Sequence, residues 1–142
     1  MKFKLNEIRL ATEGISELSA FAEKNGKEIP SKIAYWLARD LDKLNSENTP
    51  IEKVRMDLIK KYAKKDKKGN PMFMKEKDEN GKDTEKDTNQ FDISDINAFQ
   101  DEFIKLTNEE VEIDIKPIKL TDLGDVKPTI IMLYKLGKII EE

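Results

Sequence analysis

Three residues close to position 113 have the types and spacing of a metal-dependent nuclease site. Glu112, Asp114 and Lys116 alternate along a segment that predicts a strand. Alternate residues of a strand point to the same face, so the two carboxylates could hold Mg²⁺ while the lysine stabilises developing negative charge. A strand with one solvated face shows the same alternation. A Mg²⁺-dependent nuclease is therefore an alternative, and the solvated strand face is the favoured interpretation.

A second oxygen-rich pattern resembles a calcium-binding loop. Its first, third, fifth, sixth, ninth and twelfth positions are Glu76, Asp78, Asn80, Gly81, Thr84 and Asp87. However, Asp83 stands where such loops carry an aliphatic residue, the twelfth ligand is Asp rather than Glu, and no amphipathic helix flanks the segment closely. A solvated acidic loop is the favoured interpretation, and we expect no bound metal.

The sequence contains neither histidine nor cysteine. This composition excludes Ser-His-Asp and Cys-His catalysis, imidazole acid–base chemistry, disulfides, and metal sites built on thiolate or imidazole ligands. The chain also lacks a glycine-rich phosphate loop and a Rossmann glycine pattern. We therefore expect a protein that is not an enzyme, with no catalytic residue and no cofactor.

Charge is distributed unevenly along the chain, although the net charge is only -3. Residues 60–77 carry eight lysines and two acids, whereas residues 78–114 carry thirteen acids and three lysines. The basic run could contact phosphates, but a solvated helix end followed by a loop explains it equally simply. The chain has only three arginines, the residue that most often reads bases, so the sequence argues against direct nucleic-acid binding.

The acidic block predicts a different kind of partner. Along a strand, Glu110, Glu112 and Asp114 would repeat at about 6.5 to 7 Å, close to the spacing of phosphates on one nucleic-acid strand. Ordered carboxylates at this spacing could occupy the basic groove of a nucleic-acid-binding enzyme. Such an enzyme is one possible target, and any strand with alternating acids would show the same spacing.

Three helices are predicted in the N-terminal half. Apolar residues at helical spacing predict the first over about residues 5–24. Ser31 can cap a second helix, whose inner face carries Ile33, Trp36, Leu37, Leu41 and Leu44. Thr49-Pro50-Ile51-Glu52 combines a capping box with proline at the first helical position, which predicts a separate third helix with Ile51, Val54, Leu58 and Tyr62 inward.

The C-terminal half predicts strands and two further helices. A short strand at residues 71–75 is expected to pair with residues 90–93, with a mobile charged tip between them, since residues 82–89 lack apolar alternation. Ser94 can cap a helix with Ile96, Phe99, Phe103 and Leu106 inward. Residues 110–115 predict a half-buried strand with Val111, Ile113 and Ile115 inward, and residues 128–140 predict a terminal helix.

These elements together predict an α+β fold in one domain spanning residues 1–142. A group of three N-terminal helices (5–63) packs on a small antiparallel sheet, a charged hairpin or loop (64–93) projects, and a helix-strand-helix segment (94–142) follows. The start has no apolar signal segment, and no stretch of about 18 apolar residues predicts a membrane span. We therefore expect a cytoplasmic protein without membrane contact.

The layout resembles a family of uncharacterised small proteins of tailed phages and prophages of low-GC bacteria. The resemblance rests on residues 3–8 (FKLNEI), 29–35 (IPSKIAY), 58–62 (LIKKY) and 111–115 (VEIDI), and residues 66–90 form a longer loop than the family pattern. It implies an accessory binding role in the host cytoplasm. The protein would inhibit a host defence complex, as anti-CRISPR proteins do, or alternatively assist virion or tail assembly.

The surfaces expected to carry this binding are the hairpin and the acidic strand. Their predicted contact residues are Met72, Phe73, Met74, Asp78, Glu79, Asp83, Glu85, Asp87, Glu110, Glu112 and Asp114. The expected partner is a host or phage protein, and the sequence leaves open a homo-oligomer.

Overall fold

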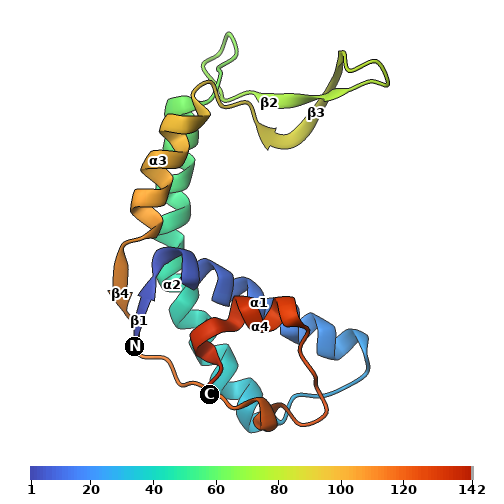
Figure 1. Ribbon diagram of the computed structural model, residues 1–142, viewed down its shortest axis with the longest axis vertical. Coiled ribbons are helices and arrows are strands. Elements are labelled where there is room, and N and C mark those ends of the chain that lie inside the picture. The colour runs from blue at the N-terminus through green and yellow to red at the C-terminus, as the bar shows by residue number, and fades with distance from the viewer. Residues whose placement is uncertain (142) are drawn as a thin grey trace. The chain divides into compact units, whose positions relative to one another are not determined.

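The computed structural model describes residues 1–141 and confirms an α+β fold (Figure 1). The helices in this range are α1 (Leu5–Lys24), α2 (Ser31–Tyr62), α3 (Ile96–Thr107) and α4 (Ile130–Leu136), with 3-10 turns η1 (Leu120–Leu123) and η2 (Gly137–Ile139). The strands are β1 (Lys2–Lys4), β2 (Phe73–Lys77), β3 (Asp83–Phe91) and β4 (Glu110–Glu112). They form two antiparallel two-stranded sheets, β1–β4 and β2–β3.

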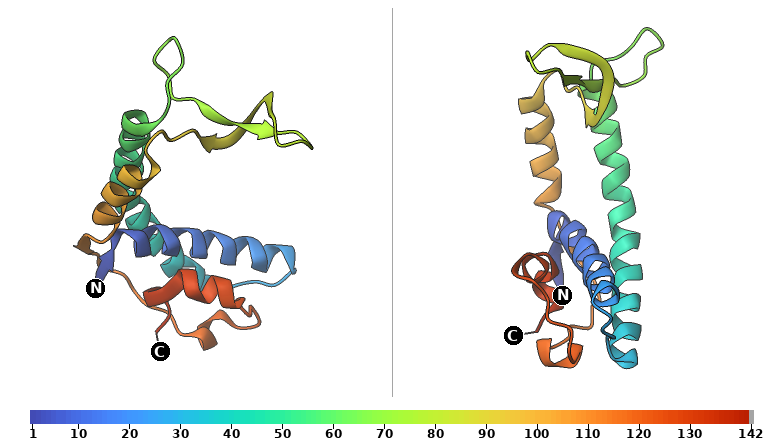
Figure 2. Two further views of the ribbon diagram at one scale, coloured as in Figure 1. Left: turned by 45° about the horizontal axis from the view of Figure 1, so that its top comes forward. Right: turned by 90° about the vertical axis from the view of Figure 1, so that its right-hand side faces the viewer.

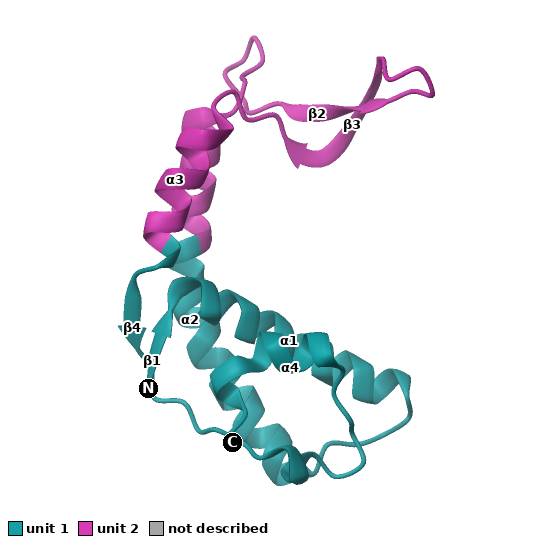
Figure 3. Cartoon of the chain, in the orientation of Figure 1, with its two compact units in different colours: residues 1–51, 107–142 teal, residues 52–106 magenta. Residues whose placement is uncertain are grey.

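The chain gathers into two compact units, where the sequence predicts a single domain over residues 1–142. The first unit comprises Met1–Ile51 and Thr107–Glu142, and the second comprises Glu52–Leu106 (Figure 3). The boundary falls inside α2, directly after Ile51. Each unit is described by itself below.

In the first unit, the N-terminal helices pack on the β1–β4 sheet. Strand β1 pairs with β4 so that Phe3 lies opposite Val111, and the Leu5 amide extends the ladder by donating to the Glu109 carbonyl at 3.0 Å. Helix α1 then begins at once and buries the apolar positions that its spacing predicts, among them Ile8, Ile15 and Leu18. Helix α4 packs along α1 (Figure 2).

Helix α2 corrects the prediction of a separate third helix. It runs without a break from Ser31 to Tyr62 and contains Pro50 in its interior. Proline there removes one backbone hydrogen bond, at a cost of about 3 kcal/mol. Apolar packing on both sides offsets that cost, because Leu44 and Ile51 are buried before and after the proline. The capping-box signal therefore marks the place where the helix passes from one unit to the other, not a helix start.

The β2–β3 hairpin is longer than the sequence predicts. Phe73 pairs with Phe91, close to the predicted pairing of residues 71–75 with 90–93. The charged segment after Asn80-Gly81 is not an unstructured tip, however, because β3 begins at Asp83. Gly81 has a φ of +76°, and the Asp78 carboxylate accepts hydrogen bonds from the Asn80 and Lys82 amides. Turn chemistry, not apolar alternation, therefore builds this hairpin.

Several predicted details need correction in the second half of the chain. The cap of α3 is Asp95, whose carboxylate accepts from the Ala98 amide at 3.1 Å, and the expected inward residue Ile96 is 55% exposed. Strand β4 is only three residues long, but Ile113 and Ile115 are buried as predicted. The terminal helix is confirmed over residues 130–136 only, followed by the turn η2. Within residues 1–141, no helix has both the length and the apolar character that crossing a bilayer requires.

Candidate functional site

The β2–β3 hairpin is ordered by polar contacts between facing residues. Lys75 forms an ion pair with Asp87, and Lys77 forms one with Asp83, which lies opposite it in the register. The nine residues of β3 face only five of β2, so the register shifts twice. At each shift a threonine hydroxyl donates to a β2 carbonyl: Thr84 to Glu76 at 2.9 Å and Thr88 to Met74 at 2.8 Å. Side chains thus replace ladder bonds that the shifts remove.

No side chain of either hairpin strand is buried. Phe73 stacks on Phe91 with ring centroids 4.5 Å apart, yet Phe73 is still 37% exposed, and Met74 is 44% exposed. Met72 is half-buried at the base of the hairpin, where its amide donates to the Lys64 carbonyl. The structure therefore places three predicted apolar contact residues at one end of the hairpin.

The predicted acidic contact residues of the hairpin separate into two groups. Asp83 and Asp87 are held by the lysines of β2, so their charges are neutralised within the hairpin. Asp78 is used in the turn, and Glu79 and Glu85 are exposed. Two residues of the calcium-loop pattern, Asp78 and Asp87, are engaged by these contacts and already have partners within the chain.

The acidic strand does not present the expected row of free carboxylates. The N-terminal ammonium of Met1 pairs with Glu112, and its hydrogen bond lowers the pKa of that carboxyl. Lys43 pairs with Asp114 at 3.4 Å. Two of the three charges that would imitate phosphates are therefore compensated by cations of the chain itself, and Glu110 is exposed.

The three residues of the nuclease pattern have different partners in the structure. Glu112 binds the N-terminus, Asp114 binds Lys43, and the Lys116 ammonium lies 3.8 Å from the ring centroid of Trp36. Among the described residues, no three acidic side chains lie together as a metal-binding group.

A buried carboxylate that sequence reasoning missed lies beside this segment. Asp40 of α2 is 1% exposed, and its Oδ1 accepts a hydrogen bond from the Lys116 amide at 3.1 Å. Its Oδ2 is buried without a partner among residues 1–141. Burial raises the pKa of Asp40, and the Lys116 hydrogen bond and the charge of Lys43 only partly oppose this. A hollow of about 450 Å³ adjoins Asp40 and Trp36.

Helical spacing could have identified Asp40. It lies three residues after Leu37 and four before Leu44, and both leucines are buried, so all three share one face of α2. An aspartate between two core leucines must find a hydrogen-bond donor, which the Lys116 amide supplies. In this way Asp40 fixes the segment that follows β4 to α2.

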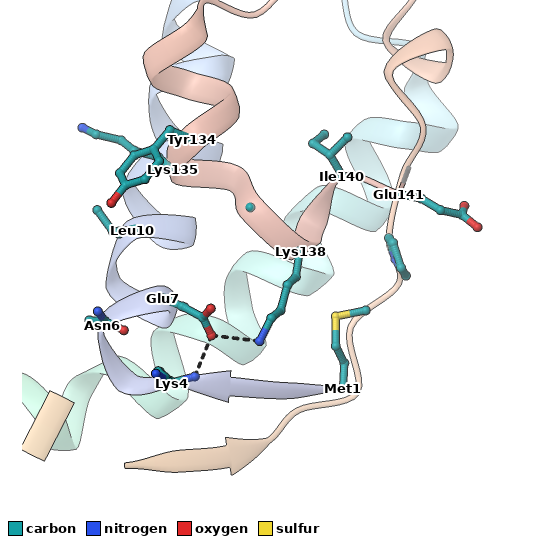
Figure 4. Close-up of a pocket in the computed structure, with 12 residues that line it drawn as sticks. Met1, Lys4, Asn6, Glu7, Leu10, Tyr134, Lys135, Lys138, Ile140 and Glu141 are labelled. Carbon is teal, nitrogen blue, oxygen red and sulfur yellow. Dashed lines mark hydrogen bonds and ion pairs between the residues drawn. The ribbon is translucent and has the colours of Figure 1, made fainter. Parts of the chain in front are cut away.

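A cavity of the first unit lies between the start of α1 and residues 134–141. Its volume is about 730 Å³, and Leu10, Tyr134 and Ile140 contribute apolar walls (Figure 4). In Figure 4 dashed lines join Glu7 to the Lys138 ammonium, at 3.0 Å, and to the Lys4 amide, at 2.8 Å. Burial acts to raise the pKa of Glu7, but these two partners outweigh it and hold the pKa below its usual value.

Comparisons with known proteins gave no match. No protein-family model matches the chain, and neither a curated protein nor a solved structure matches it.

Proposed function

We propose that this chain is a non-enzymatic binding protein that acts by protein–protein contact through the β2–β3 hairpin. The observation that supports this most is the exposure of the whole ribbon: neither strand buries a single side chain. A two-stranded hairpin is marginally stable in water on its own. Here it is ordered in advance by ion pairs, threonine hydroxyls and one ring stack.

An ordered ribbon of this kind suits recognition of another protein. Its backbone edges can pair with a strand of a partner, and its side chains can enter pockets on either side. Phe73 and Met74 offer exposed apolar area, and the exposed acids Glu79 and Glu85 offer charge for orientation. Because the ribbon is ordered before contact, binding loses little conformational entropy.

The resemblance to phage proteins supplies the setting of this proposal. We propose a host protein as the target and inhibition of a host defence complex as the outcome. A role in virion or tail assembly uses the same surface on a different partner. The two roles predict different locations: the inhibitor is found with host protein in the cytoplasm, and the assembly protein is found in particles or their precursors.

Site-specific photo-crosslinking tests the proposal. A photoreactive amino acid replaces Met74, which is 44% exposed, and Ser46 of α2, also exposed, is replaced in a control chain. After irradiation in cells, we expect a protein cross-linked through position 74 and not through position 46. The captured protein is then purified, and its affinity for the unmodified chain is measured.

Variants that introduce negative charge decide whether the hairpin carries the affinity. Phe73→Asp together with Met74→Asp should weaken binding by at least tenfold, whereas Lys32→Glu, at an exposed lysine of α2, should leave it unchanged. Equal affinity of the hairpin variant would contradict the proposal. Cleavage of labelled DNA or RNA by the pure chain with Mg²⁺ would instead favour the nuclease alternative.

A further inference from the structure

The sequence Asn-Gly-Lys occurs twice in this chain, at residues 25–27 and 80–82. Asparagine before glycine is prone to spontaneous deamidation, because glycine has no Cβ to shield its backbone nitrogen. Both copies lie on the surface, and both glycines have a positive φ, +62° at Gly26 and +76° at Gly81. The local sequence therefore gives the two asparagines similar intrinsic reactivity, and a large difference between them must come from the fold.

The reaction needs water as its only co-reactant. The backbone nitrogen of the glycine loses its proton and attacks Cγ of the asparagine, the side-chain nitrogen leaves as ammonia, and a cyclic succinimide forms. Water then opens the ring at either carbonyl and gives aspartate or isoaspartate. Isoaspartate carries the chain through its former side chain, so the backbone becomes longer by one CH2 group. In either product a neutral amide has become a carboxylate.

The fold restrains Asn25 at the end of α1. Its side-chain Nδ2 donates to the Phe21 carbonyl at 2.8 Å, and the Gly26 amide donates to the Glu23 carbonyl at 3.1 Å. Ala22, in the last turn of the helix, is buried and anchors this end to the core. The attacking geometry requires the Asn25 side chain and the backbone after it to rotate, and that rotation breaks both hydrogen bonds.

Asn80 has the backbone bonds of a turn but a free side chain. The turn forms the tip of the β2–β3 hairpin (Figure 1), where the Gly81 amide donates to the Asp78 carbonyl at 3.0 Å. Within residues 1–141 the Asn80 side-chain amide makes no hydrogen bond, and only its backbone amide donates, to the Asp78 carboxylate. The two strands bury no side chain, so the turn opens at low cost and frees the Gly81 nitrogen to attack.

We infer that Asn80 is a modification site, which deamidates spontaneously in the folded chain long before Asn25 does. The isoaspartyl form lengthens the connection between Asp78 and Lys82, whose hydrogen bond at 2.8 Å closes the turn. It also adds a negative charge beside Asp78 and Glu79. The modified chain should therefore lose the order of its hairpin. If the hairpin binds a partner as proposed above, deamidation limits the lifetime of that activity, and this consequence alone rests on the proposed function.

Ageing of the pure chain tests the inference. The folded chain is incubated at mildly alkaline pH, and peptide mapping by mass spectrometry follows the loss of each side-chain amide with time. We expect Asn80 to react several-fold faster than Asn25. In urea that unfolds the chain, the two rates should become similar, because both asparagines precede Gly-Lys. Asn80→Gln should abolish the hairpin modification, since the longer side chain must close a larger ring, and should leave the rate at Asn25 unchanged.

Hydrogen exchange measures the consequence for the hairpin. The isoaspartyl chain is separated from unmodified chain by chromatography, and its β2 and β3 amides should exchange several-fold faster, with those of α1 unchanged. Asn80→Asp is the matched control: it carries the new charge without the longer backbone and should keep most of the protection. Similar rates at Asn25 and Asn80 in the folded chain, a difference that persists in urea, or an isoaspartyl hairpin that exchanges as before would overturn the inference. None of these measurements involves a partner, so they decide the inference whatever the hairpin binds.

Discussion

At the scale of single residues, Asp40 makes the stability of the fold depend on pH. Burial raises the pKa of its carboxyl above the ordinary value of 3.8. Between 3.8 and the raised pKa, the folded chain binds more protons at this site than the unfolded chain. The free energy of unfolding therefore falls as pH rises through this window, and each unit of the shift costs about 1.4 kcal/mol at neutral pH.

Asp40→Asn should remove this contribution, because the amide does not titrate and its oxygen can still accept from the Lys116 amide. Relative to the unchanged chain, the free energy of unfolding of the variant should rise as pH increases above about 4. Urea unfolding at several pH values measures the difference. Asp42→Asn, at an exposed position two residues on, is the control and should show no such trend. Parallel pH profiles for Asp40→Asn and the unchanged chain would contradict this account.

At the scale of elements, Gly14 allows α4 to lie directly on α1. A Cβ at this position would be 3.0 Å from the Leu136 amide nitrogen and 3.0 Å from Lys135 Cβ. These are too close for ordinary contact, and the Leu136 backbone cannot rotate away as a side-chain end can. In an open helix, Gly→Ala would stabilise by up to about 1 kcal/mol. Here we expect Gly14→Ala to lower the free energy of unfolding by about 1–3 kcal/mol.

Thermal and urea unfolding of Gly14→Ala measures this loss. Ser19→Ala, at an exposed position of the same helix, supplies the control, with a change of a few tenths of a kcal/mol towards greater stability. A Gly14→Ala variant that is as stable as Ser19→Ala, or more stable than the unchanged chain, would contradict the close packing of α4 on α1 at Gly14.

How far the sequence predicts these elements depends on which interactions decide them. Helix α1 is predicted well, because the apolar residues that recur at helical spacing are the residues that the fold buries. The start of a helix at Thr49 is wrong, because the local capping signal is overridden by packing of α2 on both sides of Pro50. Only the end of strand β3 is predicted, because cross-strand ion pairs and threonine hydroxyls leave no apolar alternation to detect over residues 83–89.

The candidate surfaces are likewise predicted where local sequence decides them and missed where distant contacts do. Exposure of Met74 and Phe73 agrees with their isolation in a charged segment. The compensation of Glu112 by the N-terminus and of Asp114 by Lys43 joins residues far apart in the sequence, so no local pattern could reveal it. The sequence does not predict the exposed face of α4 either, because a helix with apolar residues on every side does not indicate which side the fold covers.

At the scale of the whole molecule, burial is distributed very unequally between the two units. Of the twenty buried apolar residues in the described chain, only Leu58, Ile59 and Ala63 belong to the second unit. Opening free energy follows buried apolar contact, so the second unit should open locally at a lower cost than the first. Hairpin amides have little covering, since no side chain of β2 or β3 is buried.

Native-state hydrogen exchange measures this difference residue by residue. Amides of β2 and β3 should exchange first, those of α3 next, and those around Ile8, Ile15 and Leu18 of α1 only with global unfolding. Hairpin amides as strongly protected as those of α1 would mean that something holds the ribbon besides its own polar contacts. Adding the captured partner should slow exchange in the hairpin and leave α1 unaffected, because a ligand stabilises the segment it binds.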